Sequence, residues 1–158
     1  MAAEDTPFLT PEAALAHWQG HRRLTRRVIE AFPDDQLFSY SIGGMRSFGD
    51  LALELLSMAE PMARGLATGA WDAYTPAKAG TKQEVLALWD EATPRIDELW
   101  GTIPAAHFQE RTTAFGQFEG PVYDLMLYVI DNEVHHRGQG YVYLRALEVE
   151  PPHFWERV

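Results

Sequence analysis

The chain has 158 residues, of which 46% are hydrophobic and 23% charged, and these values predict one folded domain over residues 1–158 rather than a disordered tail or a fibre. Thirteen Lys and Arg against 23 Asp and Glu give a formal charge of -10, which disfavours nucleic acid and anionic membrane surfaces as partners. The chain has no cysteine, so disulfides, thiolate metal sites and a cysteine nucleophile are excluded.

No targeting segment is evident in the sequence. Residues 1–11 include acidic side chains and lack the apolar stretch of a signal peptide. No apolar run approaches the length of about 18 residues that a membrane-spanning helix needs. We therefore expect a cytoplasmic protein that does not associate with membranes.

Three segments in the first two thirds of the chain combine helical periodicity with capping signals. A helix is expected over residues 10–32, where a threonine N-cap precedes a proline at the first helical position. A second is expected over 47–68, starting at a serine and ending before a glycine. A third is expected over 81–99, where Thr81 and Glu84 form a capping box.

The fourth and most regular helical segment covers residues 120–147, where apolar residues recur at spacings of three, four or seven. The connections at 33–46, 70–80 and 101–119 are long for simple hairpins between helices. The best candidate for a strand, 108–118, is polar and isolated, so we expect no sheet. The fold class predicted is all-α, a four-helix bundle with long crossover loops, whose sites usually lie between facing helices.

Two polar residues, Asn132 and His136, lie in the apolar stripe of the last helix. They are four residues apart and therefore project from one face, so that an imidazole nitrogen and an amide oxygen can meet one metal ion. The alternative is that the two side chains bond each other or a buried water, because buried polar groups usually have partners.

Glu54 lies in the segment 51–56, which is otherwise apolar on every side. An inward-facing carboxylate costs several kcal/mol unless a cation or a hydrogen-bond donor meets it. A metal ion, a histidine or an arginine would relieve that cost. We therefore expect Glu54, Asn132 and His136 to converge on one point of the bundle, with or without a metal.

The first helix carries two histidines and a basic strip. His21, four residues after His17, is a candidate for a further nitrogen ligand at the same site; alternatively, one of the pair lies near the surface and the other is a hydrogen-bonded core histidine. The strip is interpreted as a solvated face paired with acids, or as an anchor for an anionic cofactor. It consists of Arg22, Arg23, Arg26 and Arg27.

The order of the helices and three segments resemble the DinB-like, damage-inducible bundle family. These segments are 45–51, which leads to Glu54, 135–139 with the sequence HHRGQ, and 143–145. The similarity extends over roughly residues 11–155. It implies a four-helix bundle of down-up-up-down order that forms a homodimer.

The resemblance also implies a divalent metal, held in the family by one histidine of the second helix and two of the fourth. In this chain Glu54, Asn132 and His136 occupy those positions. Replacing two imidazoles by a carboxylate and an amide shifts the preference among Zn, Ni, Mn and Fe toward the harder Mn and Fe(II).

The activity that the resemblance implies is that of a metal-dependent transferase or isomerase acting on a small electrophile. Relatives use a low-molecular-weight thiol such as bacillithiol, mycothiol or glutathione, which here would replace the missing cysteine. On this hypothesis His135 or Glu133 handles protons and Arg137 holds a carboxylate. A hydrolase or isomerase that needs no thiol is a further alternative. The non-enzymatic alternative is a metal-free, ligand-binding or stress-associated dimer with Glu54, Asn132 and His136 in a core network.

Overall fold

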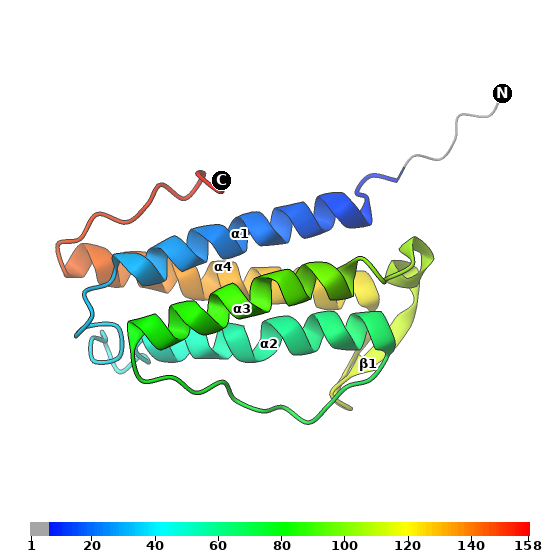
Figure 1. Cartoon of the computed structure of the whole chain (residues 1–158), viewed down its shortest axis with the longest axis horizontal. Helices are drawn as coiled ribbons and strands as arrows, with labels where there is room; N and C mark the ends of the chain where they lie inside the picture. Colours follow the sequence, from blue (N-terminus) through cyan, green and yellow to red (C-terminus); the bar gives the residue numbers. More distant parts are fainter. Residues whose placement is uncertain (1–6) are drawn as a thin grey trace.

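Four long helices make up most of the protein (Figure 1). The computed structural model describes residues 7–158; residues 1–6, on which part of the signal-peptide expectation depends, lie outside the described residues. The predicted all-α class is confirmed, and each predicted helix is present. Their bounds are α1 (Pro11–Ala31), α2 (Phe48–Thr68), α3 (Lys82–Trp100) and α4 (Val122–Ala146).

The helices form a bundle in which α1 and α2 lie diagonally opposite each other. Both pack against α3 and against α4. α2 and α3 run in the same direction, so the connection over residues 69–81 returns along the length of the bundle, as Figure 1 shows. The resulting order is the expected down-up-up-down. Within residues 7–158, no helix has both the length and the hydropathy of a membrane-spanning segment.

The helix ends are fixed by the residues that the sequence indicates. The Thr10 side chain accepts a hydrogen bond from the backbone of the first turn of α1, and Ser47 does the same for α2. Thr81 and Glu84 form the complete capping box of α3. α2 ends at Gly69, whose φ of 71° lies in the left-handed region that glycine adopts without strain.

Glycines inside two helices create room for aromatic rings. A methyl group at Gly140 of α4 would lie 2.5 Å from the ring of Phe48, which is completely buried and stacks on Phe32. A methyl group at Gly65 of α2 would overlap the ring of Trp71. These rings therefore pack directly onto helix backbones, and each joins a connecting segment or a neighbouring helix to the bundle.

A short hairpin precedes α4, and the expectation that no strands form in this part of the chain is wrong. After the 3-10 helix η1 (Ala105–Gln109), the antiparallel strands β1 (Arg111–Ala114) and β2 (Phe118–Pro121) pair over four residues each. An isolated hairpin is marginally stable, so its sequence carries a weak signal. Contact with α4 and the hydrogen bond from the Trp71 indole to Thr112 (3.3 Å) stabilise it here.

Candidate functional site

α2 presents Glu54 at the edge of the bundle, next to α4. The Glu54 side chain is half-buried, and its Oε1 lies 3.0 Å from Nε2 of His136. Asn132, one turn before His136 on α4, donates from Nδ2 to the same oxygen at 3.5 Å. The structure therefore brings Glu54 together with Asn132 and His136, which follow it by 78 and 82 residues in the sequence.

Arg46 completes the surroundings of the Glu54 carboxylate, and the sequence-based reasoning did not identify it. It lies in the connection before α2 and its guanidinium donates to Oε2 of Glu54. Burial opposes ionisation of Glu54, but the hydrogen bonds and charges of Arg46 and His136 outweigh it and lower the pKa of the carboxyl. The carboxylate is therefore ionised at neutral pH.

Gln139 fixes the orientation of the His136 ring. Its Oε1 lies 2.8 Å from Nδ1 of His136, one turn along α4. When the neutral ring donates its Nδ1–H to this oxygen, the lone pair of Nε2 faces the Glu54 carboxylate. Two electron-rich atoms 3.0 Å apart then require a positive charge between them, which is either a proton or a metal ion.

Glu54 also lines a groove of about 680 Å³ between α2, α4 and the hairpin. The groove adjoins the three convergent side chains, and its walls combine methionines and aromatic residues with the polar side chains of Gln117, Glu119 and Asp124. The methionines and aromatic residues include Met58, Met62, Tyr74, Phe115, Phe118 and Tyr128. A small molecule in the groove would therefore lie against apolar walls with one carboxylate of the polar cluster at its edge.

The fourth candidate ligand, His21, lies in a different place. Its Nδ1 accepts from Nη2 of Arg137 at 2.9 Å, and its Nε2 faces His17 and Arg157. Burial and the positive charges of Arg137 and Arg157 lower the pKa of His21 to about 4, so the ring is neutral at pH 7. His21 is thus the hydrogen-bonded core histidine of the alternative interpretation, and exposed His17 is its partner near the surface.

The hypothetical roles of Glu133 and Arg137 do not fit their positions. Both are buried on the face of α4 that packs against α1, and neither lines the groove. Glu133 accepts from Thr25 at 2.6 Å, and Arg137 donates to the carbonyl of His21 at 3.1 Å. Because neighbouring residues of a helix differ by about 100° in direction, the pair 132/136 faces α2 while 133/137 faces α1.

The basic strip of α1 is divided between solvent and core. Arg26 forms two hydrogen bonds with Asp90, and Arg27 pairs with Glu156, as a solvated face paired with acids would. Arg22 differs from that expectation: it is buried, with its guanidinium 4.4 Å from the centre of the Trp89 ring. Packing of α3 over α1 explains the difference, because Trp89 covers the first residue of the strip.

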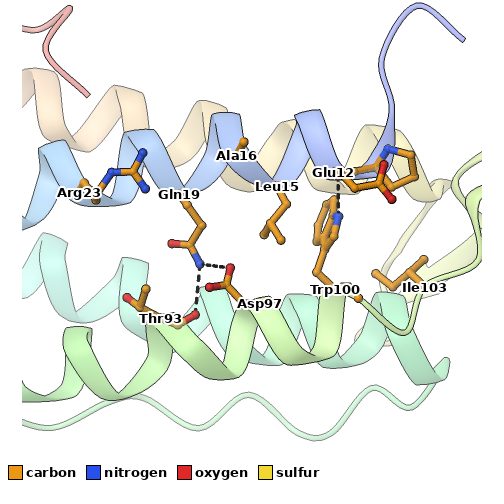
Figure 2. A pocket seen from close by; sticks show the side chains of 11 residues that line it. Glu12, Leu15, Ala16, Gln19, Arg23, Thr93, Asp97, Trp100 and Ile103 are labelled. Atoms are coloured by element: carbon orange, nitrogen blue, oxygen red, sulfur yellow. Dashed lines mark hydrogen bonds between the residues drawn. The ribbon is translucent and has the colours of Figure 1, made fainter. Parts of the chain in front are cut away.

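A second pocket, of about 400 Å³, lies between α1 and α3 (Figure 2). Part of its polar lining is internally bonded: the Gln19 amide nitrogen donates to Asp97 at 2.9 Å and to the carbonyl of Thr93 at 3.1 Å, while the Gln19 amide oxygen is buried without a partner among residues 7–158. The Trp100 indole donates to the carbonyl of Pro11 at 2.8 Å. Because no imidazole is among the residues described there, this pocket offers less chemistry than the groove beside Glu54.

The sequence matches the model of the DinB family over residues 6–157. The chain belongs to the DinB family. Two solved structures share its fold: a DinB-like protein from Bacillus cereus ATCC 10987 and a DinB-like protein from Bacillus subtilis. The first is 15% identical, with a TM-score of 0.77 over 94% of this chain and 100% of the other. The second is 19% identical, with a TM-score of 0.74 over 92% and 99%. No curated protein matches the chain.

Within this DinB family chain, the candidate metal site has an uncommon donor set. Across residues 7–158, no group of three or more His, Cys, Asp or Glu side chains is arranged to hold a metal ion. The site offers one carboxylate and one imidazole, together with the amide of Asn132. An ion here would therefore depend on Glu54 and His136 as its two strong ligands, and the Asn132 amide, whose nitrogen now faces Glu54, would have to turn over to offer its oxygen as a weaker third.

Proposed function

We propose that this DinB family protein is a metal-dependent enzyme that acts on a small molecule in the groove between α2 and α4. The observation that supports the proposal is the 3.0 Å separation of Glu54 Oε1 and His136 Nε2 at the edge of that groove. One divalent ion with bonds of about 2.0–2.3 Å can contact both atoms, and the Asn132 amide lies beside them.

The residues present fit a divalent metal. His136 has the second-sphere partner that metal-binding histidines usually have, because Gln139 accepts at Nδ1 and directs Nε2 toward the site. Arg46 holds the second oxygen of Glu54, which fixes the carboxylate while leaving Oε1 directed at His136. One nitrogen and two oxygen donors favour Mn or Fe(II) over Zn or Ni.

Such an ion would lower the pKa of a bound thiol or water and so supply a nucleophile at neutral pH. Because the chain has no cysteine, a thiol would come from a low-molecular-weight cofactor, and the reaction would be a thiol transfer or isomerisation of a small electrophile. The protein's own residues hold the reactants: the methionine and aromatic side chains of the groove contact the apolar part of the substrate, and Glu54 lies in its wall next to His136.

A metal-free, ligand-binding bundle is the second candidate, and the Arg46 contact favours it. Arg46 and His136 together already offset the charge of Glu54 without any ion. On this alternative, the three residues hold the shape of the groove, and the protein binds a small molecule, as in a stress response, without catalysis.

Metal titration of protein without a histidine tag distinguishes the two. We expect wild-type protein to bind about one Mn or Fe(II) per chain, and His136→Ala to lose at least about tenfold in affinity because a first ligand is removed. His135→Ala is the matched control, since His135 is exposed on the same helix and should leave uptake unchanged.

Equal metal affinities for H135A and H136A would contradict the metal proposal. If wild-type protein takes up no ion at millimolar concentration while H136A only loses stability, the metal-free alternative holds. In that case the loss reflects a Glu54 carboxylate left with Arg46 as its remaining charged partner.

We also propose that the chain forms a homodimer through α4. Tyr123, Leu127 and Val134 project from one face of this helix, and each side chain is about 40% exposed. A stable dimer would bury more than about 1,000 Å² around this row. Light scattering at micromolar concentration should give twice the chain mass, and Leu127→Glu should give the monomer mass. A wild-type monomer at all concentrations would refute the proposal.

A further inference from the structure

The groove beside Glu54 has acidic walls. Three carboxylates line it, those of Glu54, Glu119 and Asp124, and the described residues around it include no lysine, arginine or histidine. The chain as a whole is also acidic, with a formal charge of -10. An anion entering the groove would meet repulsion at short range and at long range, whereas a cation would be attracted at both.

The three carboxylates are not equally neutralised. Glu54 is paired with Arg46. Glu119 lies 3.2 Å from Arg111, but the side chains of Glu119 and Arg111 are both well exposed, so solvent screens their attraction. Asp124 forms no ion pair within residues 7–158. It lies in the first turn of α4, where the helix dipole favours a negative charge. The exposed Asp124 carboxylate is therefore free to attract a cation that enters the groove.

The aromatic rings of the groove are an independent observation. Tyr74, Phe118 and Tyr128 line it and are 53%, 59% and 56% exposed, which is unusual for three large rings around one space. A fourth ring, Phe115, belongs to a residue with a φ of 52°, which is uncommon for a bulky side chain, and packs against Trp71. Aromatic faces attract cations, and more so when the cation is partly desolvated.

We infer that the groove binds an organic cation, a primary to quaternary amine attached to an apolar group. Its ammonium group lies near Asp124 and the aromatic faces, and its apolar part lies against Met58 and Met62. This inference deepens the proposed function, on which it rests for catalysis, by giving the charge of the molecule that occupies the groove. Binding of the cation itself requires neither metal nor thiol.

Three probes of similar size and different charge test the inference: benzyltrimethylammonium, benzyl alcohol and phenylacetate. Calorimetric or NMR titrations are made in low salt with a chelator present, so that metal plays no part. We expect the cation to bind at least about tenfold more tightly than the alcohol, and the anion more weakly than either. Raising the salt concentration should weaken binding of the cation alone.

Two variants test whether the preference for the cationic probe arises in the groove. Asp124→Asn should lower affinity for the cation about five- to tenfold and leave that for benzyl alcohol unchanged. Phe118→Leu keeps an apolar wall but removes the ring, so it should weaken the cation more than the alcohol. Asp131→Asn is the matched control, because Asp131 is an exposed acid of the same helix outside the groove.

Equal affinities for cation and alcohol, or equal effects of D124N and D131N, would overturn the inference. If the probes show no preference for the cation but the wild-type protein binds metal, the enzyme proposal stands and its substrate is not a cation. Binding of the cation without any metal uptake would support the inference and favour the metal-free function.

Discussion

Replacing Glu133 by alanine is expected to lower the free energy of unfolding by about 3–5 kcal/mol, the largest stability effect of the substitutions considered. Glu133 is buried on α4 near two buried arginines, Arg22 and Arg137, whose positive charges act on its carboxyl without forming an ion pair with it. Burial raises the pKa of the Glu133 carboxyl, while the two guanidinium groups and the hydrogen bond from Thr25 oppose that change. Removing the side chain leaves a cavity between α4 and α1, takes from the Thr25 hydroxyl its acceptor on Glu133, and leaves the two buried guanidinium groups without the nearby acidic group.

Urea unfolding measures this effect, with Asp131→Ala as the matched control. Asp131 is an acid of the same helix two residues away, but it is exposed, so its removal should change stability by no more than about 0.5 kcal/mol. Glu133→Gln keeps the oxygen that accepts from Thr25 and should fall between the two. Similar stabilities for E133A and D131A would show that the buried charges are compensated in another way.

Gly140→Ala is expected to destabilise the protein by about 1–3 kcal/mol, although alanine is the better helix former. The new methyl group would lie 2.5 Å from the ring of Phe48, which is enclosed between α4 and Phe32 and has no free space to move into. Overpacking of this kind forces side chains from their preferred rotamers and shifts the backbone.

Gly138 provides a matched control two residues away on the same helix. A methyl group at Gly138 meets nothing within 4 Å, so Gly138→Ala should raise stability by about 0.5–1 kcal/mol through helix propensity alone. Each variant adds one methyl group to α4, and thermal or urea unfolding should separate their stabilities by about 1.5–4 kcal/mol. Equal stabilities for G140A and G138A would contradict the conclusion that Phe48 packs directly on the backbone of α4 at Gly140.

The helices and half of the candidate site could be predicted because their signals are local. Capping residues such as Thr81 are adjacent in sequence to the turns they stabilise, and helical periodicity placed Asn132 and His136 on one face. The apolar neighbours of Glu54 indicated that its carboxylate needed a partner, which the structure identifies as His136 and Arg46. Capping residues, periodicity and local composition were together sufficient for these residues.

Other features depended on contacts between distant segments, which one sequence does not reveal. His21 was expected beside His136 because both lie on apolar stripes, but periodicity within each helix does not define which neighbour a stripe faces. The hairpin was missed because its stability comes from α4 and Trp71 rather than from its own residues. Arg46 lies in an irregular connection, where no periodic pattern indicates the direction of a side chain.

The two polar faces of α4 place different constraints on the evolution of the protein. Glu133 and Arg137 hold α4 to α1 through buried hydrogen bonds, whereas Asn132 and His136 contact Glu54, which lines the groove. Substitutions at positions 132 and 136 can therefore alter ligand chemistry while 133 and 137 maintain the helix in place. Neighbouring residues of a single helix can thus follow different rules in evolution: one pair can vary with the activity while the other preserves the fold.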